Sequence, residues 1–82
     1  MSDVKIRVYR GADQHLTSTV TIPGGILRIA ASLIPRRAMA ALRDEGIELD
    51  ELVALSEKAE AQGQLVQVED HDKNERVVVS LE

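Results

Sequence analysis

The two histidines, and the carboxylates beside one of them, are the residues best suited to acid–base or metal chemistry. His71 lies between Asp70 and Asp72, and His15 is the only other imidazole. Imidazole and carboxylate groups bind divalent metals and transfer protons. In an extended chain, however, the side chains of adjacent residues diverge, and the sequence has no second ligand cluster. We therefore expect solvated turn residues here, with no metal, no cofactor and no catalytic residue.

Two other patterns give weaker signals. The serines lack the G-x-S-x-G context of a hydrolase nucleophile. Pro23-Gly24-Gly25 precedes a helical pattern, as glycines do at anion-binding helix N-termini. It lacks the Lys-Ser/Thr of a phosphate loop and the third glycine of a dinucleotide motif. We interpret these glycines as a turn and expect the protein not to be an enzyme.

Length and composition favour one small domain over residues 1–82. Cysteine is absent, which excludes disulfides and thiolate metal sites and favours a reducing compartment. The start of the chain lacks a signal-peptide core and no apolar run could span a bilayer, so we expect a cytoplasmic protein. Tyr9 is the only aromatic residue. Because aliphatic side chains bury less area than rings, a homodimer that adds buried surface is expected.

Charge is distributed unevenly along the chain. Residues 1–43 carry seven basic and two acidic side chains, a net charge of +5, and residues 44–82 carry three basic and twelve acidic ones, a net charge of −9. Such an asymmetry leads either to pairing of the two halves within a chain or to head-to-tail association. Pairing within the chain is the simpler interpretation.

Alternating apolar and polar residues predict four strands. Val4–Tyr9 and Leu16–Ile22 alternate around turn residues 11–14, which predicts an N-terminal hairpin with one apolar face. Residues 64–69 and 76–81 alternate around a turn at 70–74, which predicts a second hairpin. Periodicity leaves open whether the hairpins join within one chain or across a dimer.

Three short helices are predicted between the hairpins. The first follows Gly25 and ends near Ile34, before Pro35, with a stripe formed by Ile26, Leu27, Ala30, Leu33 and Ile34. The second covers residues 36–45 with Gly46 as its stop. The third runs from about Leu49 to Gln62, with Leu49, Leu52, Val53 and Ala59 facing inward and Glu48 as a poor cap. The order ββαααββ predicts an α+β fold, two antiparallel hairpins covered by a layer of three helices.

A group of arginines favours nucleic-acid binding as an alternative function. Arg28, Arg36, Arg37 and Arg43 could form a basic ridge, and the second and third helices resemble a helix-turn-helix. The presumed recognition helix is acidic, however, and the pI is about 5.1, both of which oppose contact with phosphates. A small transcriptional regulator or nucleic-acid binder is therefore the second hypothesis.

The first helix offers another candidate surface. Its apolar stripe, flanked by arginines, could contact a partner helix or a membrane surface. The simpler interpretation is that the stripe faces the hairpins as core, with Ile29 off the stripe and in need of separate cover. The candidate interaction surface comprises Ile26, Ile29, Leu33, Arg28, Arg36 and Arg37.

The order of VKIRVYR, TVTIP, GGILRIAASLIP, GIELDEL, GQLVQVED and ERVVVSLE resembles a small bacterial domain of the SHOCT-like type. The resemblance implies a non-enzymatic accessory domain, self-associating and linked to the cell-envelope stress response, with no catalytic residues. Glu48 and Asn74 depart from the pattern, where Asp and Gly are expected. Together with the residue patterns, this favours an interaction module, expected to be a homodimer, in which self-association or binding of a protein partner uses the first helix and exposed hairpin edges.

Overall fold

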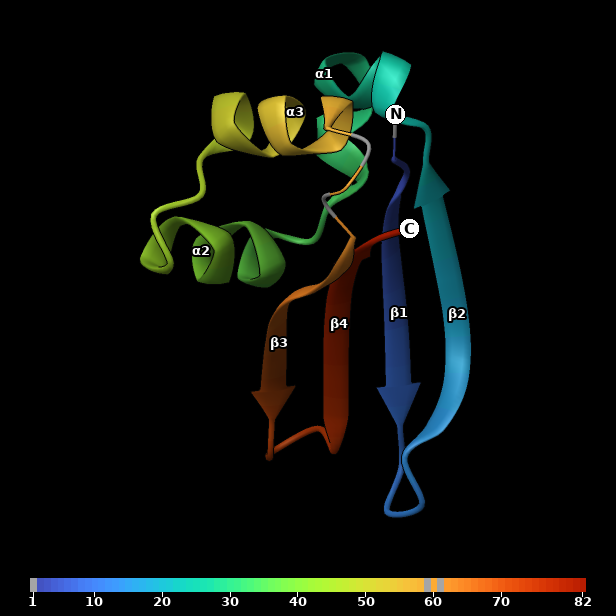
Figure 1. Cartoon of the computed structure of the whole chain (residues 1–82). Coiled ribbons are helices and arrows are strands. Elements are labelled where there is room, and N and C mark those ends of the chain that lie inside the picture. The colour runs from blue at the N-terminus through green and yellow to red at the C-terminus, as the bar shows by residue number, and fades with distance from the viewer. Residues whose placement is uncertain (1, 59, 61) are drawn as a thin grey trace.

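Two β-hairpins join within the chain to form one antiparallel sheet (Figure 1). The computed structural model describes residues 2–58, 60 and 62–82. The strands are β1 (Val4–Arg10), β2 (His15–Ile22), β3 (Gly63–Asp70) and β4 (Glu75–Leu81), in the spatial order β2-β1-β4-β3. The backbones of Asp3 and Glu82 exchange two hydrogen bonds of 2.9 Å where β1 meets β4. The predicted strands are confirmed, with ends that differ by single residues, and the hairpins pair inside one chain.

The hairpin tips are tied together by backbone contacts. Residues 11–14 and 71–74 form the turns, and each turn ends on a left-handed residue, Gln14 with φ +51° and Asn74 with φ +49°. Asn accepts this conformation readily, as expected from the sequence, whereas Gln does so less often. The carbonyl of Asn74 accepts hydrogen bonds from the Gly11 backbone N–H at 3.0 Å and from Gln14 Nε2 at 3.3 Å. The ends of both hairpins are thereby held in register.

One face of the sheet provides the floor of the core. Val4, Ile6, Val77 and Val79 are at most 2% exposed, and they alternate with residues that point to the other face. The helices lie on the apolar face, toward the end of the sheet where the chain begins (Figure 1). The opposite face is polar and partly exposed. The period-two pattern of the sequence therefore decided which side the helices cover.

The segment after β2 differs from the predicted helix. It consists of a 3₁₀ turn at Gly24–Ile26, the four-residue helix α1 (Leu27–Ala30) and a second 3₁₀ turn at Ala31–Leu33. The prediction of one continuous inward stripe is wrong, because only Leu27 and Ile34 are buried. A 3₁₀ turn has 3.0 residues per turn instead of 3.6, so the stripe rotates away from the sheet. Ile34 is extended before Pro35, as predicted.

The predicted second helix, with Gly46 as its stop, is confirmed. Helix α2 (Arg36–Asp44) buries Ala38 and Leu42. It is followed by Gly46 at φ +79°, and the N–H of Ile47 donates to the carbonyl of Leu42 at 2.8 Å. This is the left-handed termination that favours glycine.

The third helix is shorter than predicted. Helix α3 (Leu49–Glu57) ends five residues before the expected Gln62, and Lys58 is extended. Glu48 makes no capping hydrogen bond through its side chain, as its residue type predicts. Ala59, predicted to face inward, lies outside the described residues.

The architecture is α+β, with strands β1 and β2 first, then the helices, then β3 and β4. Helix α2 packs on β3 and β4, while α3 packs against the segment containing α1 (Figure 1). The buried side chains of all these elements form one core. Within the described ranges, no helix is long and apolar enough to cross a membrane.

Candidate functional site

Three large aliphatic side chains around α1 remain exposed. Ile26 is 48% exposed, Ile29 84% and Leu33 58%. We call these three residues the α1 patch. Their spacing of three and four residues places them on one side of a helical segment, and that side is turned away from the sheet. Solvation of such surface is unfavourable, so the α1 patch is a candidate contact surface.

A shallow hollow adjoins the α1 patch. Its volume is about 350 Å³. It is lined by Gly24, Gly25, Ile26, Arg28, Ile29, Val53 and Glu57. Besides the two glycines, its lining consists of aliphatic side chains and one charged residue of each sign. The hollow therefore extends the α1 patch toward α3.

The arginines of the predicted ridge do not act together. Arg28 Nη1 lies 2.7 Å from Asp50 Oδ1, and Arg37 Nη1 lies 2.7 Å from Asp70 Oδ2. Arg36 and Arg43 are exposed on α2. Half of the predicted basic ridge is thus paired with carboxylates of the same chain.

Pairing between the two halves of the chain is what the charge distribution predicted. Every Arg–carboxylate ion pair in the part of the chain that the structure describes joins a residue of 1–43 to one of 44–82. The largest cluster centres on Glu75, whose side chain is only 7% exposed and contacts Arg10 and Arg37. Hydrogen bonds from Arg10 first, and then from Arg37, lower the pKa of Glu75 against the opposing effect of burial.

Asp70, the first residue of the D-H-D triplet, holds the turn of the second hairpin. Asp70 Oδ1 accepts hydrogen bonds from the backbone N–H groups of Asp72 at 3.1 Å and Lys73 at 3.3 Å, and its other oxygen binds Arg37. The His71 side chain is 88% exposed, with Nε2 3.6 Å from Glu69. Both oxygens of the Asp70 carboxylate are thus engaged, one by the backbone of the turn and the other by Arg37 of α2.

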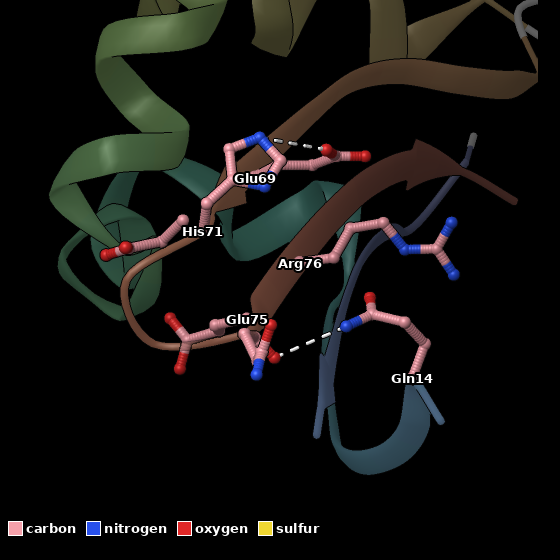
Figure 2. A pocket seen from close by; sticks show the side chains of 7 residues that line it. Gln14, Glu69, His71, Glu75 and Arg76 are labelled. Atoms are coloured by element: carbon pink, nitrogen blue, oxygen red, sulfur yellow. Dashed lines mark hydrogen bonds and ion pairs between the residues drawn. The ribbon is translucent and has the colours of Figure 1, made fainter. Parts of the chain in front are cut away.

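The hollow at the hairpin tips is polar. Figure 2 shows Gln14, Glu69, His71, Glu75 and Arg76 around this space of about 250 Å³. His71 and Arg76 are both among the residues that line it. His15 belongs to the other tip, where Nδ1 lies 2.8 Å from Asp13. Among the described residues, no three His, Asp or Glu side chains are grouped so as to hold a metal ion.

The sequence did not predict the side-chain contacts on the polar face of the sheet, opposite the helices. The guanidinium carbon of Arg76 lies 4.5 Å from the centroid of the Tyr9 ring. These residues are directly opposite each other on β4 and β1. On the same face Arg7 makes two contacts with the Glu82 carboxylate. These contacts first, and then a hydrogen bond from Ser80, lower the pKa of Glu82 to about 2. The alternation of basic residues with Tyr9 in β1 was the available signal, but the partners depend on the pairing of β1 with β4.

The comparisons correct the predicted family. A family model described as the YvlB-like protein, C-terminal domain, matches residues 4–80. Neither the search of curated proteins nor the search of solved structures found a match. The SHOCT-like resemblance is wrong, because the two families are different; its landmarks were strand and helix patterns that small α+β domains share. The match covers nearly the whole chain, so this chain belongs to the family of YvlB-like C-terminal domains.

Proposed function

We propose that this domain is a non-enzymatic interaction module that forms a homodimer, with the α1 patch as part of the contact surface. The observation that supports it is the exposure of Ile26, Ile29 and Leu33 on one short segment. In these residues the chain places three large aliphatic side chains outside its own core. A second copy is the occupant we propose, since a small core without Phe or Trp gains most from added apolar burial.

The energy available from the α1 patch is limited. Complete burial of an aliphatic side chain contributes roughly 1.5–3 kcal/mol, so covering the exposed part of three contributes about 3–6 kcal/mol. A micromolar dimer requires about 8 kcal/mol, and association also has an entropic cost. The α1 patch is therefore one part of a larger interface.

The charged groups support a binding role over a catalytic one. Asp70 and Glu75, which could assist a histidine, are engaged by Arg37 and Arg10. Arg28 and Arg37, which could contact phosphates, are engaged by carboxylates. No specific observation favours nucleic-acid binding. The role in envelope stress depended on the SHOCT-like resemblance alone, so it is not part of the proposal.

Light scattering over a dilution series tests the proposal. Wild-type protein is expected to show about twice the monomer mass of 9.0 kDa at high concentration. Ile29→Lys should raise the dimer dissociation constant at least ~10-fold, equivalent to about 1.4 kcal/mol. Ile29 is 84% exposed, so this variant keeps its core. Ala54→Lys, which adds the same charge at an exposed position of α3, is the control.

Two results would contradict the proposal. A monomer at every concentration would exclude self-association. A dimer that Ile29→Lys and Ala54→Lys weaken equally would show that the α1 patch lies outside the contact surface.

A further inference from the structure

Strand β2 forms one edge of the sheet. In the described part of the chain, β2 pairs with β1 alone, and Figure 1 shows no other helix or strand alongside its outer edge. The opposite edge, β3, is flanked by α2, whose Ala41, Asp44 and Glu45 line a hollow together with residues 64–67. The two edges of the sheet are therefore not equivalent.

The composition of β2 does not protect this edge. Soluble proteins discourage pairing at sheet edges with charges, prolines or a covering element. From Leu16 to Ile22 the strand has no charge and no proline, and its residues are mostly threonine and aliphatic. Its one irregularity is a bulge near Thr17, where the register with β1 shifts between Val8 and Tyr9. Beyond the bulge, residues 18–22 form a regular strand that is open to pairing.

The hydrogen-bond alternation identifies the free backbone groups. Asp3 exchanges both of its backbone hydrogen bonds with Glu82. The backbone N–H and C=O groups of Asp3, Lys5 and Arg7 are therefore directed toward β4. The backbone groups of the residues between them, Val4, Ile6 and Val8, are consequently directed toward β2. Their partners are Ile22, Val20 and Ser18. Thr19 and Thr21 therefore direct their N–H and C=O groups outward.

Two-fold antiparallel pairing of β2 with itself has one register that uses all of these groups. With the axis at Val20, Thr19 of each copy lies opposite Thr21 of the other, and four backbone hydrogen bonds form. An axis at Thr19 would pair Thr21 with the bulged Thr17. An axis at Thr21 would pair Thr19 with Pro23, which has no N–H.

We propose that two copies of this chain join their β2 strands antiparallel around Val20, forming a continuous eight-stranded sheet. The inference rests on the proposed self-association and names its interface. Val20 lies opposite Val20 of the second copy. The two residues form a non-hydrogen-bonded pair, in which the Cα atoms lie about 4.5 Å apart. On the other face Thr19 lies against Thr21, a favourable cross-strand pair of β-branched residues.

The α1 patch belongs to the same interface. The chain passes from Ile22 through Pro23 into the α1 segment. In the Val20 register the second copy's strand continues past Ile22 toward its own Leu16, which is 51% exposed. Each α1 segment therefore lies near the second copy's Leu16. This contact adds apolar area that a few strand residues cannot provide alone.

Disulfide trapping tests the register, because the chain has no cysteine of its own. Val20→Cys should form a disulfide dimer under mild oxidation, since a Cα separation of about 4.5 Å is within the range of a disulfide. Ser18→Cys lies on the same face, but its two copies would be separated by roughly 13 Å. The expected rate of cross-linking is at least ~10-fold higher for Val20→Cys.

Hydrogen exchange of the wild type provides a second measurement that needs no variant. The amides of Thr19 and Thr21 should become protected as the protein concentration rises. Comparable cross-linking of the two cysteine variants, or fast exchange of these amides in a proven dimer, would overturn the β2 interface and leave self-association standing. A monomer at all concentrations would overturn both proposals.

Discussion

Glu75 and Arg10 lie opposite each other on β4 and β1, and Arg10 Nε donates a 2.8 Å hydrogen bond to the Glu75 carboxylate. The same carboxylate also accepts from Arg37 of α2. The Glu75 side chain is 7% exposed, whereas those of Arg10 and Arg37 are 62% and 42% exposed. One shielded carboxylate thus joins both hairpins to the helical layer at the far end of the sheet from α1.

Replacing Glu75 by Gln should destabilise the fold. The amide removes the negative charge and places an N–H₂ group near two guanidinium groups. Charge-assisted hydrogen bonds contribute more than neutral ones, but solvent screens the two ion pairs because both arginines are partly exposed. We therefore expect the free energy of unfolding to fall by about 1–2 kcal/mol. Urea denaturation measures the free energy of unfolding. Glu45→Gln, at an exposed position after α2, should change it by less than ~0.5 kcal/mol, and equal effects would contradict the assignment.

The Glu82–Arg7 pair predicts a pH dependence. Because the folded-state pKa of Glu82 is lowered from 4.5 to about 2, its contribution to stability is present above pH 4.5 and is lost as the pH falls toward 2. Carbon-detected NMR titration of the Glu82 carboxyl should give a midpoint near the lower value. In Arg7→Gln the midpoint should rise toward 4.5, since the largest cause of the shift is removed. An unchanged midpoint would show that Arg7 is not the cause.

Leu27 and Leu33 should respond differently to truncation. Leu27 is 1% exposed and Leu33 is 58% exposed. Leu27→Ala leaves a cavity in the core and should cost about 2–4 kcal/mol. Leu33→Ala should cost less than ~0.5 kcal/mol when unfolding is measured at a concentration where the protein is monomeric. Similar losses of unfolding free energy in the two variants would support the continuous inward stripe that the sequence predicted.

Tyr9 and Arg76 should be energetically coupled. Stacking of the guanidinium at 4.5 Å from the ring is expected to contribute about 0.5–1 kcal/mol at this partly exposed site. A double-mutant cycle with Tyr9→Leu and Arg76→Gln measures the coupling free energy. Additive effects of the two substitutions would show that the contact does not stabilise the sheet.

Local patterns sufficed for most of the elements. The strands, the stop of α2 at Gly46 and the break at Pro35 follow from short-range preferences: side-chain alternation, the left-handed conformation of glycine and the restriction before proline. The charge difference between the halves likewise indicated internal pairing. Such signals act over a few residues or over whole segments, so a single sequence contains them.

The candidate site was predicted only in part. Ile26, Ile29 and Leu33 were named as a possible interaction surface, but Ile26 and Leu33 were also assigned to an inward stripe. That conflict could be decided only by the 3₁₀ geometry, which depends on how the segment fits between β2 and α3. Arg28 and Arg37 have the right residue types for binding, yet Asp50, Asp70 and Glu75 lie beside them once the chain folds.

The sequence by itself determined the types and limits of most strands and helices and the apolar face of each hairpin, because these depend on neighbouring residues. Only the tertiary structure decided that β1 pairs with β4, which places Tyr9 beside Arg76, Arg10 beside Glu75 and β2 at a free edge. Residues about 65 positions apart in sequence make these contacts. Their proximity is a consequence of chain topology, which residue periodicity does not encode.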